Sequence, residues 1–153
     1  MPAETCLGCY RKLGAREVSY HPKCSRTLFG TAVPPQLPFV EQDLLELAEQ
    51  SVLRSATVAG VQSKLSLGLL RGTTENDPGR FTIIGVGGSH ILKPASTSYP
   101  HLVELEDLTM HLARLAGIDV VPHGLIRMQD GALAYVTRRV DRVGKPAGKR
   151  MVK

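Results

Sequence analysis

The first 24 residues hold the feature that most constrains the fold, the stretch CLGCYRKLGAREVSYHPKC. It contains a C-x2-C pair followed eleven residues later by an H-x2-C pair, and the four residues are Cys6, Cys9, His21 and Cys24. Structural zinc is held by four thiolate or imidazole ligands in a tetrahedron, and a C-x2-C pair supplies two of them from one tight turn. The spacing therefore predicts a closed Cys3His zinc site, with no open position for catalysis, in a small zinc-ribbon-like module.

The alternative is three reduced cysteines that happen to lie near one histidine. A disulfide framework is not favoured, because the three cysteines are an odd number and such frameworks belong to secreted proteins. The opening residues MPAETCLGCY lack the basic and apolar regions of a signal peptide, so we expect a cytoplasmic protein. No apolar run is long enough to cross a bilayer, so we expect no association with a membrane.

Proline and helical patterns divide the first third of the chain. Residues 1–29 form the zinc-ribbon-like module, which we expect to have a core of its own, so that removal of the metal would unfold residues 1–25 alone. The stretch GTAVPPQLP at 30–38 contains three prolines and indicates an extended linker, and the apolar spacing at 40–53 predicts a helix. We therefore assign residues 30–56 to a linker and a helix.

The remaining chain alternates between strand and helix patterns. Apolar residues on alternate positions or in short runs predict strands at 63–70, 80–87, 89–93, 122–128 and 133–140. Between the third and the fourth of these, leucines recur at three- and four-residue steps and predict an amphipathic helix over 99–117; they are Leu102, Leu105, Leu108, Leu112 and Leu115. This order predicts an α+β fold in which one helix packs on a mostly antiparallel sheet of five strands.

The net charge of +5 is unevenly distributed along the chain. Residues 138–153 hold seven lysines and arginines against one aspartate, so the rest of the chain is close to neutral. Aromatic residues make up 5% of the chain and tryptophan is absent, so nucleic-acid bases would find few rings to stack on. We therefore expect any nucleic-acid binding to be weak and to depend on the tail.

A second candidate site lies before the first strand, in the stretch SATVAGVQSKLSLGLL at 55–70. Gly60 would let the backbone approach a ligand closely, neighbouring amide groups could form an anion-binding nest, and Lys64 adds a positive charge. The alternative is an ordinary turn that enters a strand.

A third candidate site joins the third strand to the leucine-rich helix. Lys93 ends the strand in HILKP, and Glu106 lies one turn into the helix. Kinases use an ion pair between a lysine on the third strand and a glutamate on the following helix to hold the α- and β-phosphates of ATP. The alternative is a solvated lysine at the end of a strand.

Four segments in this order resemble one family: TVAGVQSKLSL, HILKP, LEDLTMHLARLAGIDVVPHGL and YVTRRVDR. They resemble the HipA-type serine/threonine kinase toxins of bacterial toxin–antitoxin systems, in particular the compact HipT-like members, over about residues 57–142. The resemblance implies the N-terminal lobe of a kinase, which binds ATP, with Mg²⁺ only when the C-terminal lobe is complete, and a HipB-like antitoxin as partner. It also implies a protein substrate such as an aminoacyl-tRNA synthetase, which is the substrate class of characterised relatives.

The resemblance further implies which residues bind ATP. The family's glycine-rich loop corresponds to Ala59, Gly60, Val61, Gln62, Ser63 and Lys64, its ATP-binding lysine to Lys93, its helix glutamate to Glu106, and its adenine-binding hinge to Arg138, Arg139 and Val140. Thr57 stands at the position of an autophosphorylated serine. The chain departs from the family at Ala59, Leu105 and Arg138, where a second serine, an asparagine and an acidic residue are usual.

The catalytic part of a kinase has no counterpart among these motifs. The general base and the Mg²⁺-binding side chains lie in the second lobe, but no D-x-H-x-x-N string follows the hinge, and residues 143–153 form a basic tail that would begin that lobe. We therefore expect no catalytic residue in this chain and no kinase activity from it alone. Two alternatives stay open: a non-catalytic module that binds an antitoxin or a partner kinase, and a zinc-ribbon protein that binds nucleic acid.

Overall fold

The computed structural model describes residues 5–54, 64–74, 76–85, 87–96, 98–143 and 150–151. Its helices are α1 (Pro22–Phe29), α2 (Glu41–Arg54) and α3 (Leu102–Leu115). Its strands are β1 (Leu65–Leu70), β2 (Arg80–Ile83), β3 (His90–Lys93), β4 (His123–Arg127), β5 (Leu133–Arg138), β6 (Arg142–Val143) and β7 (Arg150–Met151). The five predicted strands and the helix predicted at 99–117 are confirmed with shorter bounds, and the helix predicted at 40–53 is confirmed one residue further along the chain. The helix α1 and the two-residue strands β6 and β7 were not predicted. Among the described helices, none combines the length and apolar content needed to cross a bilayer.

Five of the strands form one sheet in the order β2-β1-β3-β5-β4, and every neighbouring pair in it is antiparallel. The predicted α+β class and the antiparallel sheet are therefore confirmed. β1 lies between β2 and β3, so the glycines that join β2 to β3 do not form a hairpin turn. The strands β4 and β5 are neighbours joined by a short turn.

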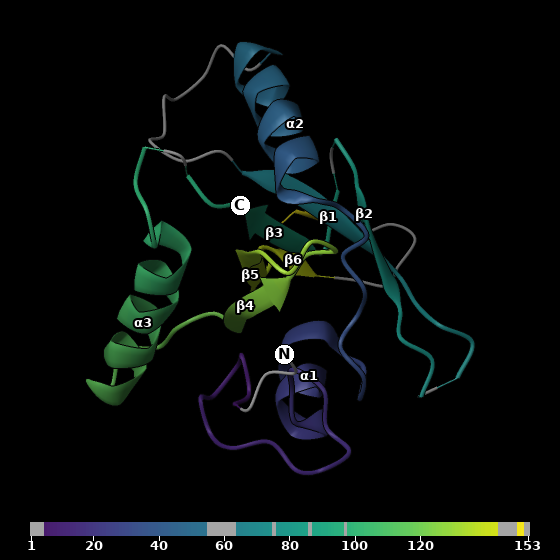
Figure 1. Ribbon diagram of the computed structural model, residues 1–153, viewed down its shortest axis with the longest axis vertical. Helices are drawn as coiled ribbons and strands as arrows, with labels where there is room; N and C mark the ends of the chain where they lie inside the picture. Colours follow the sequence, from purple (N-terminus) through teal and green to yellow (C-terminus); the bar gives the residue numbers. More distant parts are fainter. Residues whose placement is uncertain are drawn as a thin grey trace.

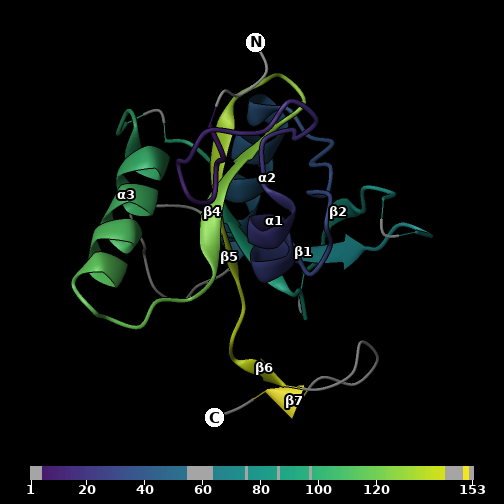
Figure 2. The same cartoon turned by 90° about the horizontal axis from the view of Figure 1, so that it is seen from below.

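Helices cover both faces of the sheet, as Figures 1 and 2 show: α3 lies on one side of β4 and β5, and α1 lies on the other side. The prediction of one packed helix is therefore incomplete. The ends of α1 have recognisable causes, because Pro22 occupies the first turn and Gly30 ends the helix in the left-handed conformation, with φ of 79°. Its last two residues, Leu28 and Phe29, are buried.

The N-terminal part of the chain, which we call the N-terminal segment (residues 5–39), covers both edges of the sheet. At the β4 edge, the Leu125 amide donates to the carbonyl of Leu7 at 3.2 Å, and the Tyr20 hydroxyl donates to the Leu125 carbonyl at 2.6 Å. At the β2 edge, the Phe81 amide donates to the carbonyl of Gln36 at 2.9 Å. Exposed strand edges are templates for unwanted pairing, so these contacts also protect the sheet.

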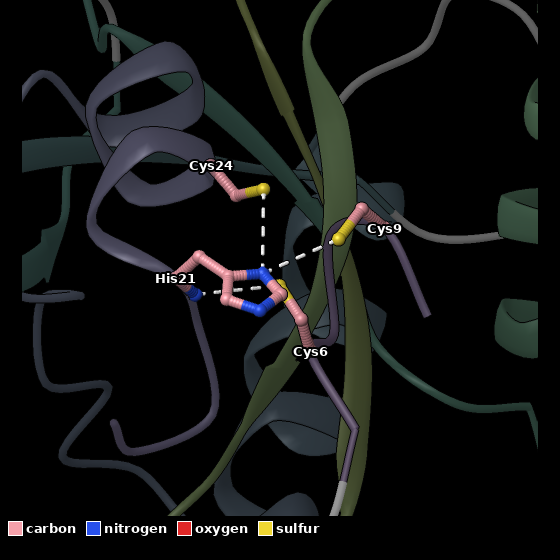
Figure 3. A group of neighbouring side chains, drawn as sticks. All are labelled: Cys6, Cys9, His21 and Cys24. Carbon is pink, nitrogen blue, oxygen red and sulfur yellow. Dashed lines mark hydrogen bonds between the residues drawn. The ribbon is translucent and has the colours of Figure 1, made fainter. Parts of the chain in front are cut away.

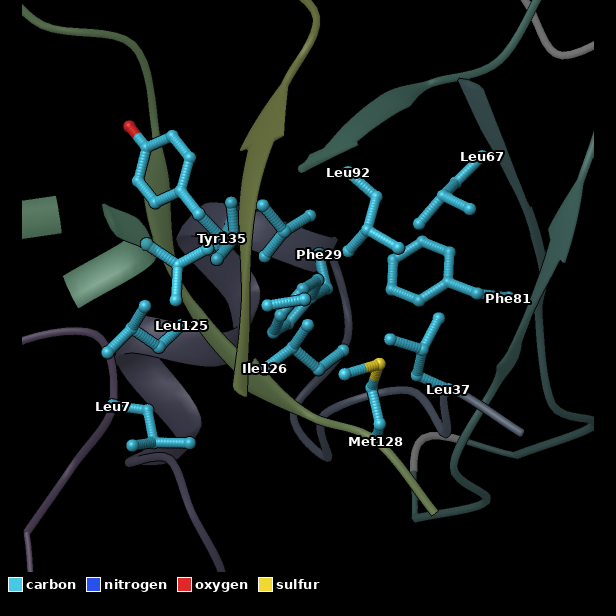
Figure 4. Close-up of a cluster of buried hydrophobic side chains, with 14 of the residues drawn as sticks. Leu7, Phe29, Leu37, Leu67, Phe81, Leu92, Leu125, Ile126, Met128 and Tyr135 are labelled. Atoms are coloured by element: carbon cyan, nitrogen blue, oxygen red, sulfur yellow. The ribbon is translucent and has the colours of Figure 1, made fainter. Parts of the chain in front are cut away.

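The hydrophobic core is continuous between the N-terminal segment and the sheet (Figure 4). Leu7, Tyr20 and Phe29 belong to the same buried cluster as the strand residues, and the rings of Phe29 and Phe81 meet edge to face at 5.9 Å. The expectation that the zinc-ribbon-like module has a core of its own is therefore wrong. So short a segment has too little apolar surface to form an independent core, and it buries its large side chains on the sheet instead.

The leucine-rich face of α3 points away from the sheet. Four leucines of this face, which are between 45% and 84% exposed, are Leu105, Leu108, Leu112 and Leu115. The buried residues of α3 are Val103 and Asp107. An amphipathic helix normally buries such a leucine stripe, so α3 has the opposite orientation to the one its leucine spacing indicates. Its polar residues have partners on the sheet and in the N-terminal segment, and those partners fix which side faces inward.

Replacing Tyr20 by Phe tests the shared core. The substitution removes the hydroxyl that covers the Leu125 carbonyl, so the free energy of unfolding should fall by about 1–3 kcal/mol, the usual cost of a buried polar group left without its partner. Urea unfolding measures this change, and Tyr99→Phe, at a residue that is 53% exposed, is the matched control. A Tyr20→Phe protein as stable as the control would contradict the shared core.

Candidate functional site

The four predicted metal ligands converge at the junction between a tight turn and a helix (Figure 3). The turn is closed by the amides of Cys9 and Tyr10, which both donate to the Cys6 carbonyl, at 3.4 and 2.8 Å. His21 immediately precedes α1, and Cys24 lies in the first turn of that helix. The four ligand atoms all lie within 4.8 Å of one another. The second ligand pair, His21 and Cys24, thus comes from the start of a helix and not from a tight turn like the one that holds Cys6 and Cys9.

The distances in this group fit a tetrahedral metal site. The Nδ1 atom of His21 lies 3.4 Å from the Cys9 sulfur and 3.9 Å from the Cys24 sulfur. A tetrahedral zinc with ordinary bond lengths separates a sulfur and a nitrogen ligand by about 3.6 Å. In the absence of a cation, burial and then the neighbouring Cys9 thiol raise the pKa of Cys24 to about 12. A divalent cation would offset this rise in the pKa of Cys24, because it stabilises the thiolate form.

The ring nitrogen of His21 that does not face the cysteines has polar partners, as is usual for a histidine that binds a metal. Its Nε2 atom lies 3.1 Å from the Lys12 carbonyl and 3.6 Å from a carboxylate oxygen of Glu17. A proton on Nε2 that is donated to the Lys12 carbonyl leaves the Nδ1 lone pair free to face the three sulfurs. This arrangement was not predicted from the sequence, although the position of Glu17 four residues before His21 was a usable signal.

Tyr10, directly after the second cysteine of the turn, connects this group to α3. It adopts a left-handed backbone conformation, with φ of 61°, which is costly for a residue other than glycine. Its hydroxyl donates to a carboxylate oxygen of Asp107, and its ring stacks on His111 with 4.5 Å between centroids. The Tyr10 side chain thus makes both contacts from a strained backbone conformation.

Asp107 is the centre of a buried polar group that we call the Asp107 cluster: Tyr10, Asp107, His111 and His123. The Asp107 and His123 side chains are fully buried, and Nδ1 of His123 lies 2.7 Å from a carboxylate oxygen of Asp107. His111 lies between the carbonyl of Asp107, 2.9 Å from its Nδ1, and the carbonyl of Gly8, 3.3 Å from its Nε2. Nothing in the sequence spacing indicated that these residues meet.

The Asp107 cluster also has the residue types of a metal site, since ligand atoms of Asp107, His111 and His123 lie within 4.8 Å of one another. Both carboxylate oxygens, however, already contact hydrogen-bond donors on Tyr10 and His123. His111 Nδ1 likewise lies at hydrogen-bond distance from a backbone carbonyl. We therefore interpret the cluster as a hydrogen-bonded network that fixes α3 to β4 and to the cysteine turn.

Lys93 and Glu106 contact each other on the side of the sheet that α3 covers. The ammonium group of Lys93 contacts a carboxylate oxygen of Glu106, and the two side chains are 23% and 25% exposed. The ammonium also lies 5.7 Å from the centre of the Tyr135 ring. Glu106 directly precedes Asp107, so one turn of α3 contributes both to this ion pair and to the Asp107 cluster.

The predicted ATP-binding loop is described only at its end. Thr57, Ala59, Gly60, Val61, Gln62 and Ser63 lie outside the described residues. Lys64 is exposed directly before β1. Because Leu65 pairs with Leu92, the sheet register places Lys64 at the same end of the sheet as Lys93.

The predicted hinge lies at the other end of β5. Lys93 pairs with Tyr135 and His90 pairs with Arg138, so three residues, or roughly 10 Å, separate the two positions along the sheet. The amides of Arg138 and Arg139 already donate to the carbonyls of Pro122 and Ser89, each at 2.9 Å. These two amides are therefore not available to an adenine ring, and Val140 is exposed beyond them.

A cavity of about 300 Å³ opens beside this end of β5. It is lined by Phe29 and His90 and by three arginines, Arg71, Arg138 and Arg139. Arg138 reaches toward the Thr27 carbonyl at the end of α1, so its side chain lies on the face opposite α3. Neither Lys93 nor Glu106 lines this cavity, so it is separate from their ion pair.

The comparisons with known proteins point to one family. No curated protein matches the sequence. The structure is similar to HipA of Shewanella oneidensis MR-1, solved in a complex of HipA, HipB and operator DNA, with a TM-score of 0.43 and 23% identity. That match covers 76% of this chain and 28% of the Shewanella chain, so the protein spans well under half of that relative. The model of the HipA-like C-terminal domain matches residues 56–152, which is more than half of the sequence, and the chain therefore belongs to the HipA-like family.

Proposed function

We propose that this chain is the ATP-binding N-terminal lobe of a HipA-type serine/threonine protein kinase and that it carries a structural zinc ion. The observation that carries the proposal is the contact between Lys93 on β3 and Glu106 on α3. A half-buried lysine held by a carboxylate at this place in the lobe is the arrangement with which kinases hold ATP phosphates. Membership of the HipA-like family supports the same function.

In this proposal Glu106 orients the ammonium of Lys93, which supplies positive charge to the α- and β-phosphates. By the family resemblance the loop from Ala59 to Lys64 would bind the phosphates, and of this loop only Lys64 belongs to the described residues. The hinge binds adenine through groups other than the amides of Arg138 and Arg139, because neighbouring carbonyls already occupy these two amides. In this proposal the lobe positions a nucleotide, and a second lobe would supply the groups that orient the nucleophile and bind the Mg²⁺ ions.

The four ligands Cys6, Cys9, His21 and Cys24 would hold the zinc ion. Four protein ligands complete a tetrahedron, so the ion would stabilise structure and would not bind a substrate. Their separations and the contact between His21 and the Lys12 carbonyl support zinc at this place. The second ligand pair begins a helix, so the proposed module would resemble a zinc ribbon only in its first ligand pair.

The whole kinase would act on a protein, such as an aminoacyl-tRNA synthetase, in the cytoplasm, and a HipB-like antitoxin would bind it. These partners are proposed from the family alone. One observation favours the second candidate function, a non-catalytic interaction module: the exposed leucines of α3 offer an apolar surface. Nucleic-acid binding would be weak and would depend on residues 143–153, most of which lie outside the described residues.

Metal analysis tests the zinc site. Protein purified in reducing buffer should contain one zinc ion per chain, and Cys9→Ser should lose it. Because the N-terminal segment shares the core of the sheet, a chelator should lower the thermal midpoint of the whole chain in one transition. Well under one zinc per chain in the unsubstituted protein would contradict the site, and an unfolding step confined to the first 25 residues would contradict the shared core.

Substitution of Lys93 tests nucleotide binding. Titration with ATP and Mg²⁺, followed by nuclear magnetic resonance, should show weak binding that Lys93→Ala reduces about tenfold or more, a loss of at least about 1.4 kcal/mol. Lys23→Ala, at an exposed position on α1, is the control. Equal binding by the Lys93→Ala and control proteins would refute the nucleotide site. Labelled ATP should leave no phosphate on the protein, Thr57 included.

A further inference from the structure

The cysteine turn touches α3 directly, through the Asp107 cluster. Gly8 lies between the two cysteines of the turn, and its carbonyl lies 3.3 Å from Nε2 of His111. Tyr10 follows the second cysteine, and its hydroxyl donates to Asp107 while its ring stacks on His111. All of these contacts start within the turn that carries two of the metal ligands.

The same contacts hold α3 against the sheet. The leucines of α3 face outward, so the inward face depends on a few apolar contacts and on polar ones: Asp107 with His123 on β4, at 2.7 Å, and Glu106 with Lys93 on β3. Asp107 and Glu106 are adjacent. A shift of α3 that breaks the contact of Asp107 with Tyr10 therefore also changes the position of the Glu106 carboxylate.

We propose that metal loading of the Cys3His site positions α3 and thereby sets the Lys93–Glu106 ion pair, with Tyr10 and Asp107 as the positioning residues that link the two sites. The metal at the Cys3His site and the use of this ion pair for nucleotide binding both rest on the proposed function. The link itself concerns the cysteine turn, the Asp107 cluster and α3, all of which are described.

The physical basis of the link is the backbone of the turn. A metal ion bound by Cys6 and Cys9 would restrain that turn, including the left-handed conformation of Tyr10, which is unfavourable for a tyrosine in a free chain. Without the ion, Tyr10 loses this restraint, and its hydrogen bond to Asp107 is weakened. Coupling between two sites is reciprocal, so a change in α3 that weakens the link must weaken metal binding by the same factor.

Reciprocity gives the first test, a measurement of zinc affinity by competition with a chelator. Asp107→Asn and Tyr10→Phe remove no metal ligand, yet each should weaken zinc binding about fivefold or more, the usual size of a coupling between two linked sites. Leu112→Ala, on the exposed face of the same helix, is the control and should leave the affinity unchanged. Unchanged affinity in both cluster variants would overturn the proposal.

The second test reads the ion pair without any nucleotide. A limiting amount of an amine-acylating reagent, followed by peptide mass spectrometry, measures how accessible Lys93 is relative to the exposed Lys23. At saturating zinc and with unchanged circular dichroism, Tyr10→Phe should raise Lys93 acylation several-fold, and Leu112→Ala should not. Lys93 that stays equally protected in Tyr10→Phe would overturn the proposal. Because neither test uses ATP, a failure of nucleotide binding would leave their outcome unaffected.

Discussion

The buried carboxylate of Asp107 is the interaction on which the arrangement of the other elements depends. It comes from α3, meets His123 on β4 and accepts a hydrogen bond from Tyr10 beside the cysteines. A fully buried carboxylate is costly unless donors surround it, so these partners must stay in place for the fold to be stable. One side chain thus fixes the inward face of α3 and the position of the cysteine turn on the sheet, and it is adjacent to the glutamate that contacts Lys93.

Local patterns in the sequence were enough to predict much of this structure. Alternating leucines in β1 and the runs around β3, β4 and β5 marked the strands, because each spans a few residues between glycines, prolines or turns. The cysteine and histidine spacing identified the four residues that converge, and the strand order made a contact between Lys93 and Glu106 available. Each of these signals depends on residues close together in the chain or on simple connectivity.

What the sequence did not reveal depends on contacts between distant segments. The leucine stripe of α3 indicated a buried face. The partners of Asp107, His111 and Glu106, however, lie 13 or more residues away or in the N-terminal segment, and they turn the polar side of the helix inward. The shared core depends on contacts of Tyr20 and Phe29 with the sheet, and no local pattern in the sequence indicates such contacts. The helix α1 had usable signals in Pro22 and Gly30, but Pro22 was assigned to the zinc-ribbon-like module and Gly30 to the linker.

Hydrogen exchange tests the central claim, that the metal site, α3 and the sheet form one cooperative structure. Amide exchange should be followed by mass spectrometry in the zinc-loaded protein and after chelation. The account predicts that loss of zinc speeds exchange in residues 6–24 and, together with them, in α3 and β4, because Tyr10 and Leu7 contact these elements directly. Faster exchange confined to residues 6–24, with α3 and β4 as protected as before, would contradict it.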